Sequence, residues 1–352
     1  MTEPRPYYEP DLALLQKAFG PDVITCHVEL LKVAFSWSRV YRLSFAQLGS
    51  SDVKSVVVKT IDPHGPATAL ESERELRFYE QIHPRLTIPK PEVYSLSTDA
   101  TSGFHVIVME DLTPTHRTPA HPYRWTPSEL HSVLRAYAEL HTQSITDISV
   151  PWLAPRIEDL IDFERLPALA GEVQAAGIWG DLPDLDRLID FARSTCERFA
   201  NEPLRLLHGD TTPANASLPK DLNEAATLID WQDVGLGLPE FDLAYLDLQP
   251  FESAQGMPRA ELLNLYWRLR QEIDPEIPAP ALRRLRQLHA DVTNALWLIV
   301  PANRVARQPY MPGTYPHMHW ASQFGVVYNR LRSLGEELTE SRPVVHIPVS
   351  QP

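Results

Sequence analysis

Two short stretches of the chain hold side chains of the types that phosphoryl transfer needs. Residues 207–215 contain Asp210 and, five positions later, Asn215, and residues 228–231 contain Asp230. Such a reaction requires a base near the acceptor hydroxyl, oxygen ligands for magnesium and a cation for the nucleotide phosphates. Asp210 could be the base, and the amide of Asn215 and the carboxylate of Asp230 are hard oxygen donors of the type that magnesium prefers. The two stretches together indicate a magnesium-assisted phosphotransfer site.

Each of these residues also has a plainer explanation. Asp210 could open an Asx-turn, Asn215 could cap the next segment, and Asp230 could belong to a turn at a strand end. For any one residue alone, the plainer explanation is preferred. For the three together the functional one is favoured, because strand-like runs at 204–207 and 226–229 deliver both stretches to loops. Their order and spacing also match the catalytic Asp, the metal-binding Asn and the second metal-binding Asp of protein kinases.

Apolar runs in the first third of the chain predict the strands that would hold a nucleotide. Strands are expected over residues 24–31, 38–45, 53–60 and 104–109, after a short helix over 11–19. Lys59 stands near the end of the third strand, where kinases use a lysine to reach the α and β phosphates of the nucleotide. Lys59 is therefore the candidate cation, although a lysine can also simply mark a strand end in solvent.

Beyond the third strand the pattern is mainly helical. Residues 126–129 provide an N-cap, a proline at the first helical position and a capping-box acid, and they predict a helix that continues to residue 140. Helical periodicity also appears over residues 68–82, 157–199, 259–273, 281–300 and 320–338.

The motifs resemble those of a known superfamily. His208-Gly209-Asp210 with Asn215, followed by Ile229-Asp230-Trp231, is similar to the aminoglycoside phosphotransferase and choline kinase superfamily. The resemblance implies a two-lobed α+β protein kinase-like fold. Its small antiparallel-sheet lobe, residues 1–111, would bind the nucleotide, and its larger, mostly helical lobe, residues 112–352, would carry catalysis and the acceptor site. The run 110–112 and Gln232 look closer to the ecdysteroid-kinase-like branch than to the antibiotic-resistance enzymes.

The resemblance also implies roles for the residues of the second half. Asp210 would position the acceptor hydroxyl and act as the catalytic base. Asn215 and Asp230 would hold Mg²⁺. Asp242 would be a buried acid that braces the catalytic loop and takes no part in the chemistry.

By the same resemblance, a second set of residues would bind ATP. Lys59 would clamp its phosphates, and Glu75, on the helix after the lysine strand, would orient Lys59. Backbone groups of Glu110, Asp111 and Leu112, where the chain passes from the small lobe to the large one, would hold adenine.

The phosphate-binding loop departs from the kinase pattern. Kinases use glycines there because backbone N–H groups must approach the phosphates closely, whereas residues 33–41 contain none. The loop offers Ser36 and Ser38 instead, whose hydroxyls could contact phosphate, with Trp37 at its tip. This departure leaves open a catalytically silent, pseudokinase-like nucleotide-binding scaffold.

Composition and net charge limit the kinds of partner that the protein could bind and the place where it could act. With 46 acidic and 32 basic residues the net charge is −14, which argues against binding to nucleic acid. No run is long and apolar enough to span a membrane, and residues 1–10 lack a secretory pattern, so a cytoplasmic location is expected. Two cysteines, Cys26 and Cys196, are too few for a disulfide framework, and both are expected to be inert buried thiols.

The acceptor is expected to be a small molecule. After Asp230 the chain reaches residues 242–245 without the long segment ending in Ala-Pro-Glu that protein kinases use. The sequence therefore predicts a small-molecule kinase that moves the γ-phosphoryl group of ATP to a hydroxyl. The sequence does not choose among several classes of acceptor, which are aminoglycosides, macrolides, choline-like amino alcohols, sugars and steroid alcohols. It also does not decide between ATP and GTP as the donor, and it does not give the oligomeric state.

Overall fold

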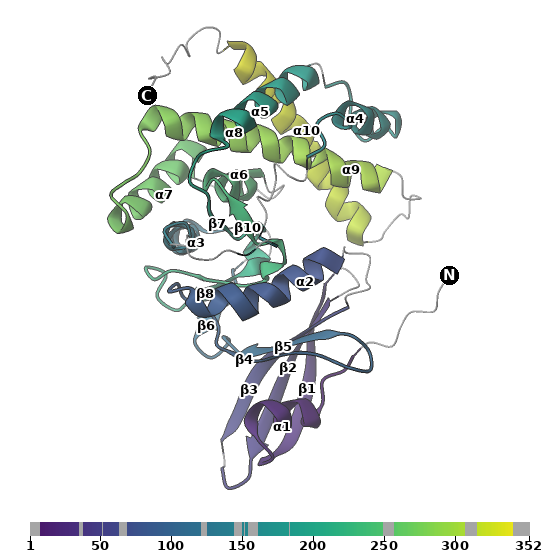
Figure 1. Cartoon of the computed structure of the whole chain (residues 1–352), viewed down its shortest axis with the longest axis vertical. Coiled ribbons are helices and arrows are strands. Elements are labelled where there is room, and N and C mark those ends of the chain that lie inside the picture. Colours follow the sequence, from purple (N-terminus) through teal and green to yellow (C-terminus); the bar gives the residue numbers. More distant parts are fainter. Residues whose placement is uncertain are drawn as a thin grey trace. The chain divides into compact units, whose positions relative to one another are not determined.

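The computed structural model of the protein is shown in Figure 1. It describes residues 8–34, 38–50, 52–62, 69–120, 125–143, 150, 152–153, 161–182, 184–248, 257–306 and 315–340. The chain forms two compact units. The first consists of residues 1–122, 128–153 and 213–234, and the second of residues 123–127, 154–212 and 235–352. The lobe boundary expected at residue 111 stays a prediction.

An antiparallel five-stranded sheet dominates the first unit. Its strand order is β1-β2-β3-β5-β4, and the bounds are β1 (Val23–Ala34), β2 (Ser38–Gln47), β3 (Val53–Ile61), β4 (Val93–Thr98) and β5 (His105–Glu110). Four of these strands were predicted, and β4 was not.

The two faces of this sheet carry different side chains. One face buries Leu43, Val56 and Val58 in a core that also includes Leu15 of α1 (Leu12–Phe19). Successive side chains of a strand point to opposite faces. The residue after Val58 is Lys59, so its ammonium group projects from the other face.

The predicted helix over 68–82 is continuous but changes type. An α-helix, α2 (Ala69–Arg77), passes into a π-helical turn, η1 (Phe78–Ile82), and a short 3-10 turn, η2 (His83–Arg85). α2 lies against another 3-10 turn, η5 (Trp231–Asp233). This contact brings residues far apart in the sequence to the helix that carries Glu75.

The rest of the first unit consists of one helix and short strands. The predicted helix is α3 (Pro127–Leu140), which buries Leu130, Leu134 and Tyr137. Three strands form a second sheet in the order β6-β8-β9, with bounds β6 (His116–Arg117), β8 (Ala216–Pro219) and β9 (Thr227–Leu228), and the 3-10 turn η4 (Pro213–Asn215) leads into β8.

The second unit is mostly helical. A two-stranded ribbon pairs β7 (Arg205–Leu207) with β10 (Gly235–Gly237). The helices are α4 (Leu166–Ala175), α5 (Leu185–Phe199), α6 (Glu240–Leu248), α7 (Arg259–Ile273), α8 (Pro280–Trp297), α9 (Ile299–Ala306) and α10 (Tyr315–Glu340).

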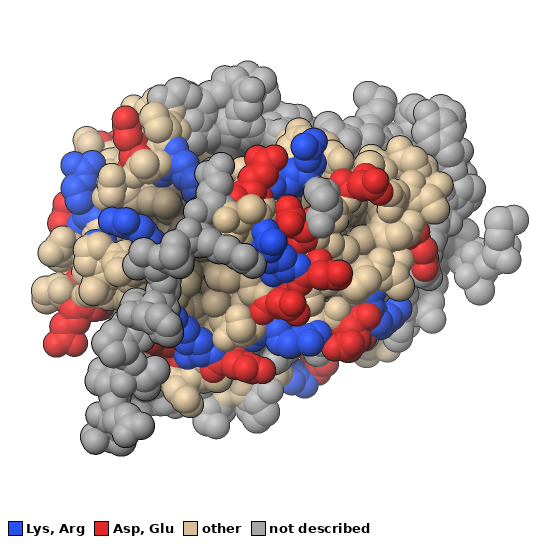
Figure 2. Space-filling model, turned by 90° about the horizontal axis from the view of Figure 1, so that it is seen from above, with Lys and Arg blue, Asp and Glu red and all other residues tan. Residues whose placement is uncertain are grey.

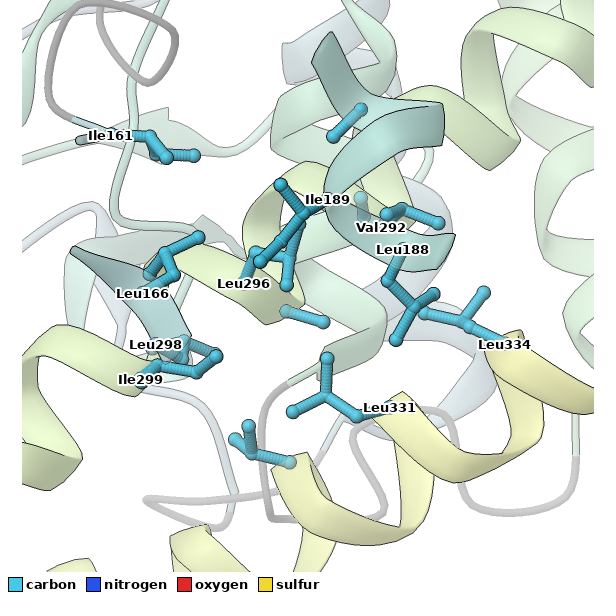
Figure 3. Packing of buried hydrophobic residues seen from close by; sticks show 14 of the residues in the cluster. Ile161, Leu166, Leu188, Ile189, Val292, Leu296, Leu298, Ile299, Leu331 and Leu334 are labelled. Carbon is cyan, nitrogen blue, oxygen red and sulfur yellow. The ribbon is translucent and has the colours of Figure 1, made fainter. Parts of the chain in front are cut away.

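The hydrophobic core of this unit is built from helices that are far apart in the sequence. Figure 3 shows Leu188 of α5, Leu296 of α8 and Leu331 of α10 directed into one apolar cluster. The helix predicted over 281–300 is divided into α8 and α9. Pro301 explains the division, because it lacks the N–H that would bond four residues back and its ring crowds that carbonyl.

The face of the molecule seen in Figure 2 carries charges of both signs. In Figure 2 the described acidic and basic side chains are interspersed over the visible face. Within the described ranges, no helix has both the length and the apolar character that crossing a bilayer would require. Cys26 and Cys196 are only half-buried, which corrects the expectation that both are buried.

A buried carboxylate at the start of α6 makes stability depend on pH. Burial raises the pKa of Glu240 to about 7 from its ordinary 4.5, although Arg286 and Arg270 oppose the shift. Between these two pH values the folded state keeps a proton that the unfolded state has lost. The free energy of unfolding should therefore fall as pH rises through this window, by at most about 3 kcal/mol.

Glu240→Gln should remove this dependence. We expect the variant to exceed the native protein in unfolding free energy at pH 8, where the native carboxylate is buried and charged, and to lose that advantage near pH 4.5. Urea unfolding at both pH values measures this. Glu197→Gln, an exposed change on α5, is the matched control, and pH curves of the same shape for all three proteins would contradict the prediction.

Candidate functional site

Lys59 is the centre of a buried cluster of charges in the first unit. Its Nζ lies 2.9 Å from Oε1 and 2.7 Å from Oε2 of Glu75, and 2.6 Å from Oδ1 of Asp230. Lys59 is 6% exposed and Glu75 1%, so water screens these pairs little. The structure thus brings together three candidate residues that are far apart in the sequence. One lies on β3, one on α2 and one after β9.

This arrangement keeps the amine charged. Burial alone would lower the pKa of Lys59, but the nearby carboxylates of Asp230 and Glu75 outweigh burial and raise it. The ammonium group is consequently a fixed positive charge at neutral pH, available to phosphate oxygens as well as to the two carboxylates.

Asp230 has an unusual backbone. Its φ is 68° and its ψ is 67°, in the left-handed region, and no other non-glycine residue in the described ranges has a positive φ. Such a conformation costs about 1–3 kcal/mol and persists only where surrounding structure imposes it. The strain therefore marks residue 230 as a position with a demanding geometry.

Trp231 imposes that geometry. Its buried ring stacks on Phe78 with centroids 4.2 Å apart, and its Nε1–H donates to the carbonyl oxygen of Leu228 at 3.2 Å. Its backbone N–H also donates to the carboxylate of Glu75. One residue thus holds the Asp230 turn and the lysine's partner together, a positioning role that the sequence did not predict.

Asn215 is held beside the same turn. Its carbonyl oxygen accepts a hydrogen bond from the backbone N–H of Ile229 at 2.9 Å, and Ala216 pairs with Leu228 in the β8–β9 ladder. Asn215 is 4% exposed. The hairpin therefore sets the two candidate metal ligands, Asn215 and Asp230, at adjoining ends of paired strands.

The loop of Asp210 belongs to the second unit. The carboxylate of Asp242 accepts hydrogen bonds from the backbone N–H groups of His208 at 2.8 Å and Gly209 at 2.9 Å, and the hydroxyl of Thr211 donates to its carbonyl oxygen at 3.2 Å. Asp242 is 1% exposed. Its predicted bracing of this loop is confirmed, whereas the catalytic role of Asp210 stays a prediction.

The candidate adenine segment is tied to the sheet. Glu110 ends β5, and its N–H donates to the carbonyl of Glu92 at 2.8 Å, while the carbonyl of Leu112 accepts from Thr115 N–H at 3.0 Å. Asp111 is 8% exposed, and its side chain is turned into a polar network instead of toward solvent. Nothing in the sequence pattern predicted that network.

The two serines of the phosphate loop differ in what can be said of them. Ser36 lies outside the described residues. Ser38 is the first residue of β2, is 5% exposed and pairs with Ile61 of β3. Phosphate contact by either serine stays a prediction.

Magnesium fits the donors present. Within the described ranges, no group of three or more His, Cys, Asp or Glu side chains could hold a metal ion. Mg²⁺ is commonly held by one or two carboxylates together with substrate phosphates and water. The oxygen donors of Asn215 and of Asp230, which lies 2.6 Å from the ammonium group of Lys59, match that mode of binding.

Residues 37–275 match the phosphotransferase enzyme family. No curated protein matches the chain.

Solved structures agree with the fold. A provisionally named aminoglycoside phosphotransferase from Ralstonia eutropha JMP134 has 16% sequence identity and a TM-score of 0.67, over 93% of this chain and 97% of that chain. An amicoumacin kinase, solved with AMP-PNP and Ca²⁺, has 12% identity and a TM-score of 0.55, over 90% and 93%. A spectinomycin phosphotransferase, solved with ADP and its antibiotic, has 14% identity and a TM-score of 0.53, over 94% and 97%.

These likenesses confirm the predicted fold class. The chain has the α+β architecture of kinase-like phosphotransferases, with an antiparallel N-terminal sheet and a helical C-terminal region. Identities this low establish the fold alone, and placement in the ecdysteroid-kinase-like branch stays a prediction.

Proposed function

Because the chain belongs to the phosphotransferase enzyme family, we propose that it transfers the γ-phosphoryl group of ATP to a hydroxyl group of a small molecule. The observation that carries this proposal is the buried cluster of Lys59, Glu75 and Asp230. A charged lysine shared between two carboxylates, one of them on a strained turn next to Asn215, is suited to holding phosphates and a divalent cation.

The roles follow from the positions of these groups. Lys59 binds phosphate oxygens, and Glu75 keeps its amine in place through contacts of 2.7 and 2.9 Å. Asn215 and Asp230 hold magnesium, which neutralises negative charge on the phosphates when it is bound. Asp210 orients the acceptor hydroxyl and takes its proton. The protein thus acts mainly by placement and by fixed charge, the two effects expected to dominate phosphoryl transfer.

Adenine nucleotides are the proposed donors. The amicoumacin kinase was solved with AMP-PNP and the spectinomycin phosphotransferase with ADP, and both resemble this chain in fold. For the acceptor, we propose a small molecule with a hydroxyl group, in keeping with the absence of an Ala-Pro-Glu segment after Asp230.

A screen followed by a rate measurement tests the proposal. Hydroxylated metabolites and antibiotics would be screened by thermal shift with Mg²⁺ and AMP-PNP present, and each hit would be assayed for ADP release from ATP. We expect ADP release that depends on the acceptor, is lost when EDTA removes the metal and returns with added Mg²⁺. Tight ATP binding without turnover across the panel would instead favour the silent scaffold.

A further inference from the structure

We propose that Arg42 is a positioning residue for the nucleobase: through its ion pair with Asp111 it fixes the chain segment that receives adenine, and it thereby sets the affinity for the base rather than for the phosphates. This inference rests on the proposed function and adds to it a determinant of nucleotide recognition.

Arg42 joins three separate parts of the first unit. Its Nε donates to Oδ2 of Asp111 at 2.9 Å, one terminal nitrogen donates to Oγ1 of Thr113 at 2.7 Å, and the other donates to Oε2 of Glu29 at 3.2 Å. The guanidinium therefore links β1 and β2 to the residues that follow β5. A planar group with several donors in fixed directions suits such a task better than the point charge of a lysine.

Asp111 completes the network. Besides Arg42, its carboxylate accepts from Oγ of Ser55 at 2.8 Å, from the N–H of Thr113 at 3.0 Å and from the hydroxyl of Thr113 at 2.6 Å. Burial alone would raise the pKa of Asp111, but these hydrogen bonds and the charge of Arg42 lower it. The carboxylate is thus charged and anchored on several sides, and the backbone at 111–113 has little freedom.

The sheet register places this network next to Lys59. Val40, Lys59 and Ile107 form one cross-strand row, and Arg42, Val57 and Met109 form the next row on the same face. Adjacent rows on one face lie about 6.8 Å apart along a strand. If the phosphates lie at Lys59, a base farther along the same face meets Val57, Met109 and the segment 110–112.

A purely structural role is the competing explanation, and the ligand distinguishes the two. We expect Arg42→Met to weaken binding of Mg·ATP by about tenfold, the loss typical of a charge-assisted hydrogen bond. Binding of Mg·tripolyphosphate, which has phosphates but no base, should change less than about twofold because Lys59 and Asp230 are untouched. Isothermal titration calorimetry measures both affinities, and kcat should change far less than KM for ATP.

Further variants make the test decisive. Asp111→Asn, which keeps the shape but removes the charge, should reproduce the selective loss, and Arg42→Lys should restore part of the affinity for ATP. Arg77→Met breaks an exposed pair with Glu73 on α2 and is the matched control. Equal losses for both ligands, or no loss for either, would overturn the inference while leaving the proposed function intact. A native protein that binds no Mg·ATP would overturn the proposed function and this inference with it.

Discussion

Replacing Asp210 with alanine is expected to lower kcat by about 10²–10⁴-fold, the range that a positioned acid–base group contributes, while the affinity for Mg·ATP changes little. The affinity should persist because the groups proposed for the nucleotide are elsewhere, at Lys59 and Asp230. The fold of the loop should persist because Asp242 holds it through the backbone N–H groups of His208 and Gly209. Removal of the side chain at 210 leaves these bonds in place.

The measurement needs one acceptor found by the screen, a phosphate-transfer assay and calorimetry with AMP-PNP. Asp210→Asn adds an isosteric comparison that removes only the charge, and it should lose turnover nearly as fully as the alanine variant. Asp190→Ala, an exposed change on α5 in the same unit, controls for general effects of losing a carboxylate. Turnover within twofold of the native rate in the Asp210 variants would remove this residue from the mechanism.

The fold was predictable where the hydrophobic period was strong. α1, β1, β2, β3, β5, α3 and α7 follow clear patterns and were found within a few residues of their observed bounds. β4 was missed because it is an edge strand with only partly buried side chains and reads as a polar loop. α6 was missed for a different reason: residues 240–244 are all buried although Glu240 and Asp242 are acidic, so polar and apolar side chains do not mark an exposed and a buried face.

The candidate site was predictable at the level of residue types and less so at the level of contacts. Motif spacing pointed to Lys59 and Asp230, and resemblance alone selected Glu75 from several glutamates of its helix. The pair of Arg42 with Asp111 spans 69 positions of the chain and depends on sheet register, which local pattern does not encode. The presence of an arginine on a strand does not tell whether its side chain joins such a network or lies exposed to solvent.

Loss of the lysine should have the largest effect on stability. In Lys59→Met, the carboxylates of Glu75 and Asp230 would stay close together, with side chains only 2% and 19% exposed, and without their shared counter-ion. Removing one partner from a buried ion pair typically costs about 3–5 kcal/mol, a large part of the roughly 5–15 kcal/mol that stabilises an ordinary domain. Urea unfolding measures the loss, and Lys54→Met, an exposed change on the same strand, should cost less than about 0.5 kcal/mol.

A second substitution separates folding from binding at this site. Lys59→Met combined with Glu75→Gln removes the more deeply buried uncompensated charge, so the double variant should regain much of the lost unfolding free energy. It should not regain affinity for Mg·ATP, because the amine that meets the phosphates is still absent. Native affinity in a stable double variant would show that Lys59 serves the fold alone. A double variant no more stable than the single one would mean that Asp230, not Glu75, carries the energetic weight of the cluster.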